Sequence, residues 1–291
     1  MDQSETHPGT KKRLVLPWTF SGVAAFSRVR LGQCLFHYTA WAVACALLWA
    51  WSIHRAWVPG VELALSKFPE KVSIRAGHLV WPTSHPVVLS NDRFLSIIVN
   101  PGDESSVDRT ADIQFELGGS ELRCRSFLGW IECPYPAFWS LDFGRDTALP
   151  WWGAWKPSLM TSVALVLGLA LFTSWVVVAV VYTGPGLVIA RILGKPAEFS
   201  QIWRVTVAAL LPGAAFLTTA VVFYSFNRIT LLLLSVFWLG HWVVGWIYLV
   251  GGIMCLPKSP PATAADSSPN PFGEGKNSHS RESRKNPFQN Q

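Results

Sequence analysis

The sequence predicts an α-helical membrane protein with four transmembrane helices and a small, mainly β extracytoplasmic domain inserted between helices 1 and 2. Composition is the first reason: 50% of the 291 residues are hydrophobic and only 14% are charged, against roughly 25% charged residues in an ordinary soluble domain. The second reason is a set of uncharged apolar runs of about 20 residues, the length that crosses the hydrocarbon core. The third is a content of 16 tryptophans, whose amphipathic rings favour the headgroup level of a bilayer.

Residues 1–33 are predicted to form a cytoplasmic N-terminus that begins polar and ends in an interfacial helix, in which Arg28 and Arg30 lie among apolar residues. The first transmembrane helix is expected at residues 34–57, because Cys34 to Ile53 contain no Asp, Glu, Lys or Arg. A cleaved signal peptide is the rival interpretation. The apolar run is long, however, and it leaves through bulky tryptophans rather than through a small-residue cleavage site, so we expect an uncleaved anchor.

Residues 58–155 have the composition of a water-facing extracytoplasmic domain, with short apolar runs separated by Gly, Pro, Asn and Asp. Alternation of apolar and polar residues predicts short strands there. The expected strands are Val72–Arg75, His78–Trp81, Phe94–Val99, Asp112–Leu117 and Glu121–Ser126. The turn Gly118-Gly119-Ser120 should join the last two as a hairpin, with Leu122 and Cys124 facing the same core as the apolar residues of the preceding strand. A disulfide between Cys124 and Cys133 would help so small a domain.

Three more transmembrane helices follow, separated by one surface segment and one very short loop. Pro212-Gly213 should bend the third helix, because proline removes a backbone donor. After Pro257 the chain becomes rich in Ser, Pro, Asn and charged residues, a composition that predicts disorder. The expected segments are transmembrane helix 2 at 156–183, a cytoplasmic amphipathic connector at 184–204, transmembrane helix 3 at 205–226, transmembrane helix 4 at 229–255 and a disordered cytoplasmic tail at 256–291.

The basic residues gather in three segments that four spans would bring to one side of the membrane. By the positive-inside rule that side is cytoplasmic, together with both termini. We therefore expect a multi-pass protein of a cell membrane, inner or plasma, with the lipid bilayer rather than nucleic acid as the partner of its positive charge. The predicted membrane-surface contacts are Arg28, Arg30, Arg191, Lys195 and Arg204.

No catalytic, cofactor or metal site is predicted. His37 and His241 are the clearly intramembrane titratable groups, and histidines near helix ends more often bond a neighbour than hold a metal or haem. The outer acidic loop Asp103–Asp112 lacks the spacing of a calcium loop. An enzyme would require a cluster such as His78, His85 and Asp92 to converge on folding.

Two short tripeptides in the tail, Asn270–Phe272 and Asn286–Phe288, resemble the motif that endocytic EH domains bind, although a chance repeat in such a tail explains them equally well.

The segment Ile192–Arg204, which leads into a predicted span containing Leu211-Pro212, resembles the surface segment and interrupted helix of the Yip1-like membrane module. The overall layout is similar to an uncharacterised bacterial family labelled as maltodextrin-utilisation membrane proteins. Ile74–Leu79 and Leu95–Asn100 resemble outer-domain strands of that family, although Val99-Asn100-Pro101 departs from its usual Asp-Thr ending. The resemblance implies an architecture and assigns no catalytic residue.

By elimination we expect a non-enzymatic scaffold or sensor that presents its outer domain to an envelope or membrane protein partner. The alternative is an oligomeric transport or lipid-handling component, with a homo-oligomer forming the pathway. Small hydroxyl residues would then line helix contacts. Those residues are Thr173, Ser174, Thr218 and Thr219.

Overall fold

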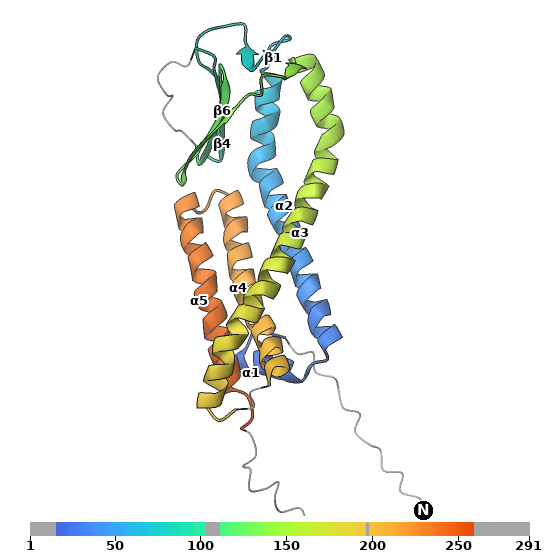
Figure 1. Cartoon of the computed structure of the whole chain (residues 1–291), viewed down its shortest axis with the longest axis vertical. Helices are drawn as coiled ribbons and strands as arrows, with labels where there is room; N and C mark the ends of the chain where they lie inside the picture. Colours follow the sequence, from blue (N-terminus) through green and yellow to red (C-terminus); the bar gives the residue numbers. More distant parts are fainter. Residues whose placement is uncertain (1–15, 103–110, 196–197, 259–291) are drawn as a thin grey trace, which may run out of the picture.

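A computed structural model describes residues 16–102, 111–195 and 198–258 of the chain. Long helices form an elongated bundle, and a β domain sits above two of them and beside the other two (Figure 1). Within the described residues four helices are long and apolar enough to cross a membrane. The β domain lies between the first and second of these along the chain, so the predicted order of spans and domain is present. Residues 259–291 of the tail predicted at 256–291, and residues 103–110 of the acidic loop, lie outside the described residues.

The two helices that flank the β domain are much longer than a bilayer requires. α2 (Leu31–Ser66) has 36 residues and α3 (Arg145–Ile192) has 48, so at 1.5 Å per residue they extend about 54 and 72 Å. Their outer halves project past the other helices as a paired stalk (Figure 1). In this stalk Lys156 Nζ donates to Glu62 Oε1 over 2.8 Å.

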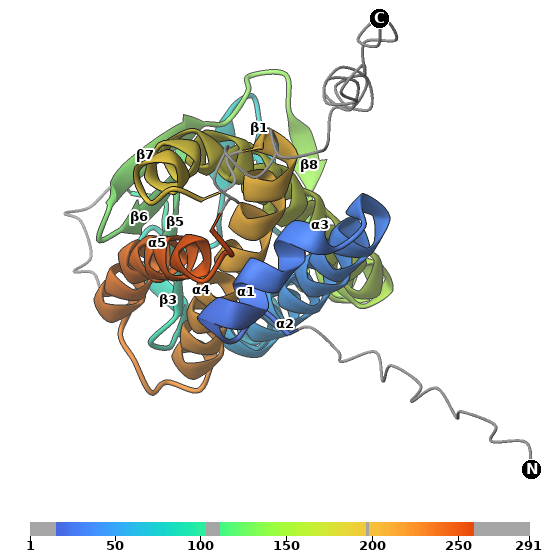
Figure 2. The same cartoon turned by 90° about the horizontal axis from the view of Figure 1, so that it is seen from below.

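The other two helices form a tight antiparallel hairpin. α4 (Phe199–Ser225) and α5 (Leu231–Met254) are joined by the short loop at 226–230. Small residues let the two backbones approach closely: a Cβ added to Gly213 would lie 2.6 Å from the carbonyl oxygen of His241. Trp49 Nε1 of α2 donates to Thr218 Oγ1 of α4 over 3.1 Å. α4 is therefore the central helix, packed by α2, α3 and α5 (Figure 2).

The N-terminal segment packs beneath this hairpin. α1 (Phe20–Ala25) is capped by the Thr19 hydroxyl and continues into the 3-10 helix η1 (Phe26–Arg28). Val23 and Phe26 are fully buried, and Phe20 and Val23 lie against Gly251 and Gly252 of α5. A short helix therefore lies within the segment predicted to hold an interfacial helix, and its buried apolar residues cover protein.

The β domain contains two sheets. The smaller has the order β2-β1-β8, formed by β1 (Ser73–Arg75), β2 (His78–Val80) and β8 (Ser140–Asp142). The larger has the order β3-β4-β5-β6-β7. Its strands are β3 (Val87–Asn91), β4 (Leu95–Asn100), β5 (Ile113–Gly118), β6 (Glu121–Ser126) and β7 (Gly129–Pro134). All five predicted strands are present within a residue or so of their expected ends, whereas β3, β7 and β8 were not predicted.

One face of the larger sheet is apolar, as the predicted alternation requires. Phe115 pairs with Cys124 and Leu117 with Leu122 across the β5–β6 hairpin, so these residues share one face. Leu89 and Val99 of the same face pack with Ala64 at the end of α2. This apolar layer fixes the sheet against the stalk.

The opposite face of β5 is polar yet more deeply buried than the apolar face. The Glu116 side chain is 0% exposed, and its Oε1 lies 3.3 Å from Arg123 Nη1 while its Oε2 lies 3.4 Å from Arg125 Nη2. Asn100 Nδ2 also donates to Glu116 Oε1 over 2.9 Å. A buried carboxylate requires such compensation, so the two arginines of β6 hold the charge within the central strand.

The helix limits differ from the expected ones in three places. The first helix continues to Ser66 and the second begins at Arg145, so residues 58–66 and 145–155, assigned to the β domain, are helical. The expected connector at 184–204 is shorter, because α3 runs through Gly184-Pro185-Gly186 to Ile192 and α4 begins at Phe199. Gly186 packs against Ile202 of α4 and Ile253 of α5. It therefore allows α3 to approach these helices closely and does not end a helix.

Candidate functional site

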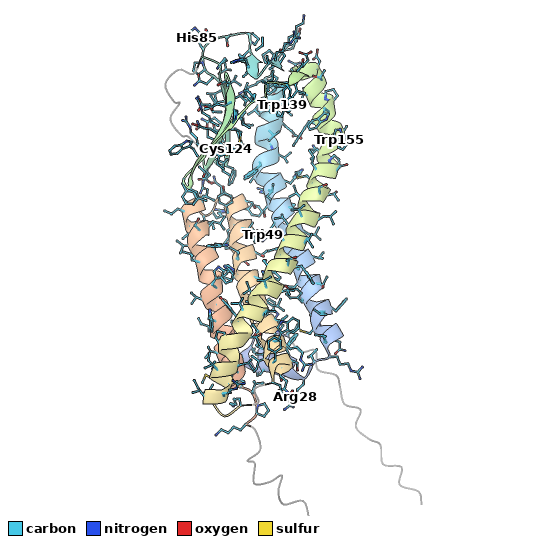
Figure 3. The ribbon with its side chains drawn as sticks, in the orientation of Figure 1. Arg28, Trp49, His85, Cys124, Trp139 and Trp155 are labelled. Carbon is cyan, nitrogen blue, oxygen red and sulfur yellow. The ribbon has the colours of Figure 1, made fainter. Side chains whose placement is uncertain are left out.

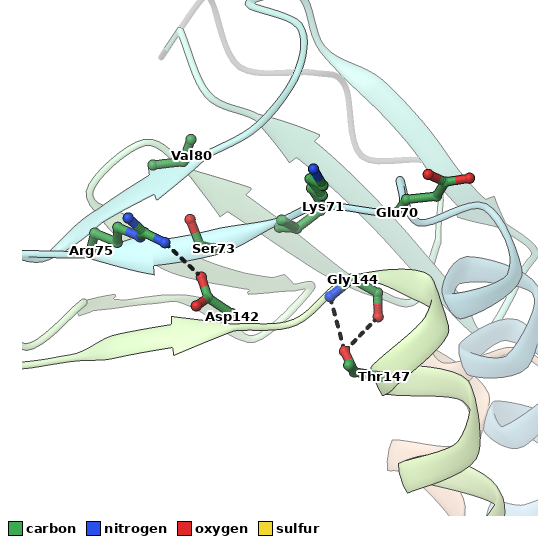
Figure 4. A pocket seen from close by; sticks show the side chains of 9 residues that line it. Glu70, Lys71, Ser73, Arg75, Val80, Asp142, Gly144 and Thr147 are labelled. Carbon is green, nitrogen blue, oxygen red and sulfur yellow. Dashed lines mark hydrogen bonds and ion pairs between the residues drawn. The ribbon is translucent and has the colours of Figure 1, made fainter.

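A hollow lined mainly by polar residues lies at the end of the molecule where both stalk helices join the smaller sheet. We call it the distal pocket; its volume is about 550 Å³. Figure 4 shows the side chains that surround it. They are Glu70, Lys71, Val72, Ser73, Arg75, Val80, Asp142, Gly144 and Thr147.

Backbone contacts between the two stalk ends build this pocket. Phe143 N donates to Val72 O over 2.8 Å, and Arg145 N donates to Pro69 O over 2.9 Å. The chains approach so closely that a Cβ on Gly144 would lie 1.7 Å from Glu70 O, so only glycine fits there. Thr147 Oγ1 accepts from Gly144 N and donates to Gly144 O, which fixes the first turn of α3.

The pocket carries charges of both signs and two hydroxyl groups. Arg75 and Asp142 form an ion pair of 3.2 Å across β1 and β8, with side chains that are 65% and 71% exposed. An exposed pair of this kind adds little stability. Because both side chains are exposed, their charged groups are accessible to another molecule. The surroundings suit a polar ligand or peptide that carries charge.

A second built contact joins the β domain to the helical hairpin through the turn between β3 and β4, residues 91–94, which we call the docking turn. Arg93 donates from Nη1 to Asn227 O over 3.2 Å and from Nη2 to Ile229 O over 2.6 Å. Asp92 Oδ1 accepts from the amides of Phe94 and Leu95 and so fixes the turn.

Two further contacts secure this junction. The Tyr224 hydroxyl of α4 donates to Asp112 Oδ2 over 3.0 Å, and the Phe94 and Tyr224 rings meet edge to face at 5.1 Å. On the other side, Gly60 of α2 leaves room for Ser90 and Asp92. The β domain therefore packs between α2 and the α4–α5 loop.

The five basic residues predicted to contact the membrane surface lie at the opposite end of the bundle, and they divide into two groups. Arg28, Arg30 and Arg191 are exposed (Arg28 is labelled in Figure 3). Lys195 and Arg204 instead hold the chain together: Lys195 Nζ donates to the carbonyls of Met254 and Leu256 at the end of α5, and Arg204 Nη1 donates to Val29 O over 2.9 Å. Lysine at a helix C-terminus satisfies carbonyls that lack helical partners.

The candidate disulfide does not form in this structure, in which Cys124 and Cys133 are both free. Cys124 pairs with Ile131 and Cys133 with Leu122, so the two thiols are diagonal neighbours on one face. Diagonal Cβ atoms lie about 7 Å apart, too far for a disulfide without movement of the strands. Burial, and then the neighbouring Cys133, raise the pKa of the Cys124 thiol above its ordinary value.

The histidine and carboxylate candidates are not brought together. His37 Nδ1 bonds the carbonyl of Gln33 and His241 Nδ1 that of Trp238, each within its own helix. His85 and Asp92 are separated by all of β3, about 17 Å of strand. Among the described residues no group of three or more His, Cys, Asp or Glu is placed to hold a metal ion.

An apolar groove of about 420 Å³ opens between α2 and α3 within the spans. Gly168 of α3 lies near Ala46 of α2, at 3.6 Å from an added Cβ to the Ala46 Cβ. Of the four hydroxyl residues predicted to line helix contacts, Thr218 joins α2 to α4, whereas Ser174 and Thr219 donate to carbonyls of their own helices.

Comparisons with protein-family models, with curated proteins and with solved structures found no match to this chain.

The sequence drew attention to Asp92 and Asp112 but did not indicate the contacts that these residues make. Arg93 and Asp112 resembled ordinary loop charges, and their common feature in sequence is only that each precedes an apolar strand. Thr147 had a clearer signal, because the Gly-x-x-Thr spacing from Gly144 is typical of a helix start.

Proposed function

We propose that the chain is a multi-pass protein of a cell membrane that acts as a non-enzymatic sensor or scaffold, with its β domain outside the cytoplasm and both termini inside. One observation carries the sensor proposal: Gly144 and Thr147 line the distal pocket, and the helix that starts there continues unbroken to Ile192 at the other end of the bundle. A ligand in the pocket would contact the first turn of a helix that ends on the far side of the membrane.

The charge distribution supports this orientation. Arg28, Arg30, Arg191 and Lys258 lie at the helix ends opposite the β domain, and short segments rich in Lys and Arg stay cytoplasmic. A reporter enzyme fused near Gly118, active only outside the cytoplasm, should be active. Activity of a cytoplasmic reporter at that site would contradict the orientation.

The docking turn gives the scaffold part of the proposal its support. The outer domain is held to α4 and α5 by directed hydrogen bonds, so a partner protein bound outside would be fixed relative to the spans. Photo-crosslinking in intact membranes from Val80, which is 53% exposed at the pocket rim, should capture such a partner, whereas the same group at Val88, outside the pocket, should not.

Coupling along α3 can be tested without knowing the ligand. Spin labels at Arg28 and Arg191, both exposed, report the distance between two cytoplasmic-end segments. Filling the pocket with Ser73→Trp should shift the measured distance distribution, and the control Val88→Trp, an exposed position on β3, should leave it unchanged. Equal distributions in a folded Ser73→Trp variant would contradict the sensor mechanism.

The alternative function, an oligomeric transport or lipid-handling component, draws its support from the α2–α3 groove. Its lining is almost wholly apolar, as suits an acyl chain or a helix of a second copy. Reconstituted vesicles should then show movement of a fluorescent lipid, and Gly168→Leu should abolish it by filling the groove. Gly153→Leu, where nothing lies within 4 Å, is the matched control.

Membership of the Yip1-like group is likewise a proposal. Its support is that Leu211-Pro212 lies inside α4 and that the motif residues form hydrogen bonds, Gln201 with Glu198 and Arg204 with the Val29 carbonyl. Exchange of α3 to α5 with the equivalent helices of a Yip1-like protein should give a folded chimera if the proposal is right.

A further inference from the structure

The turn between β6 and β7 exposes an apolar cluster that the fold of the domain does not use. Leu128 is 83% exposed, Trp130 70% and Ile131 65%. Residues 126–131 contain no charge. Exposed apolar clusters of this kind mark contact with another molecule or with lipid.

Strand register places this turn at the end of the sheet that faces the helical hairpin. Ser126 pairs with Ile113 of β5 and with Gly129 of β7, so the turn lies beside Ile113. The preceding residue, Asp112, accepts the hydrogen bond from Tyr224 at the outer end of α4. Figures 1 and 2 both show this end of β6 and β7 near the outer end of α5.

The apolar residues of α5 begin at that same level. α5 starts with four consecutive leucines after Thr230, and Leu232 in its first turn is 67% exposed. An exposed leucine there indicates that lipid tails reach the first turn of α5. The α4–α5 loop therefore lies at the headgroups, and the β6–β7 turn lies beside it.

We propose that the β6–β7 turn inserts into the leaflet on its own side of the membrane and anchors the β domain to lipid. Leu128 supplies the apolar tip that enters the acyl boundary, and Trp130 supplies an indole suited to the headgroup region, where tryptophan is enriched. The docking turn fixes the domain on one side and the lipid contact supports it on the other. The inference requires only that the helices cross the bilayer and does not depend on the sensor or scaffold function.

Spin labelling of the full chain in lipid nanodiscs tests the proposal. Leu128→Cys is compared with Leu141→Cys, which is also exposed but lies on β8 of the membrane-distal sheet. In both, Cys124, Cys133 and Cys255 are replaced by serine, so that the introduced thiol takes the label. Nanodiscs contain phosphatidylcholine with phosphatidylglycerol, and collision rates are measured with oxygen, which concentrates in lipid, and with a polar nickel chelate, which stays in water.

The label at position 128 should collide several-fold more with oxygen, relative to the nickel chelate, than the label at position 141. Equal ratios at the two positions would overturn the proposal by showing that the turn lies in water. A label at position 128 that is shielded from both reagents would also overturn it, because a protein surface would then cover the turn. Both sites are exposed, so neither substitution threatens the fold.

Discussion

α3 and α4 are both apolar helices that could cross a membrane, yet they have opposite surroundings. In the most apolar window of α4, 72% of the residues are buried inside the protein, against 6% in that of α3, although α3 has the higher mean hydropathy. The central position of α4 among the other helices accounts for the difference, and its small residues Ala208, Ala209, Gly213 and Ala214 are all buried. High hydropathy indicates that a helix is excluded from water, whereas buried small side chains indicate that it packs closely against other helices.

The strongest test of this comparison exchanges a glycine in each helix. Gly213→Ala in α4 places a methyl group 2.6 Å from the His241 carbonyl oxygen, so α5 must move, and overpacking of this kind costs about 2 kcal/mol. Gly184→Ala in α3 meets nothing within 4 Å and should change stability by less than about 0.5 kcal/mol. Unfolding in mixed micelles with increasing dodecyl sulfate measures both. Equal midpoints would contradict the assigned roles of the two helices.

A second test weakens the hold of the β domain on the outer end of α4. Arg93→Ala removes two hydrogen bonds to the α4–α5 loop, which at the usual worth of charged donors costs about 1.5 kcal/mol. Amide exchange in residues 226–230 should quicken in the variant. Arg228→Ala, an exposed arginine of the same loop, is the control, and a comparable increase there would show that loop charge alone is responsible.

A smaller effect is expected at the end of the bundle opposite the β domain, where two basic residues follow one another closely in sequence. Lys195→Ala exposes the final carbonyls of α5 and should cost about 0.5 kcal/mol, the usual scale for a cation at a helix C-terminus. Arg191→Ala should cost nothing measurable, because Arg191 is exposed. The same mixed-micelle unfolding distinguishes them, and a larger loss in Arg191→Ala would reverse the assignment.

The last test extends the comparison to two cysteines of one sheet and concerns reactivity. Cys133 is exposed, whereas Cys124 is half-buried with a raised pKa. Because its pKa is raised, Cys124 is thiolate, the reactive form, in a smaller fraction of molecules at neutral pH than an ordinary cysteine would be. Cys124 is also less exposed than Cys133, so maleimide should label Cys133 first. The Cys124 rate should keep rising at pH values above its ordinary pKa, which mass spectrometry of timed samples can follow. Faster labelling of Cys124 at neutral pH would contradict this.

Much of the fold was accessible from the sequence because it depends on local patterns. Uncharged length gave the four helices, and alternation with a Gly-Gly-Ser turn gave the β5–β6 hairpin. The stalk was missed because residues 145–155 combine Trp, Pro and charge in a way that resembles a loop, whereas in the structure they form the start of α3. β7 was missed because it is an exposed edge strand whose residues bury nothing.

The candidate sites depend on long-range contacts, which local patterns do not encode. Nothing near Arg93 indicates that its partners are carbonyls 134 and 136 residues away. The distal pocket depends on β1 and β8 meeting at the two ends of the domain. The basic residues were grouped correctly at one end by span counting, but their division into exposed and internally bonded residues required coordinates.

The pairing of β1 with β8 also has a consequence for how the chain folds as it is made. Arg75 and Asp142 stand 67 residues apart and form a hydrogen bond as diagonal neighbours across β1 and β8. Contacts of such long range form late, because the intervening loop must first be closed. The β1–β2 hairpin is synthesised first, and one edge of β1 stays unpaired until β8, the strand just before α3, has been synthesised. Completion of this sheet is therefore the step at which the domain becomes a closed unit, and premature termination before residue 140 would leave that edge unpaired and prone to aggregation.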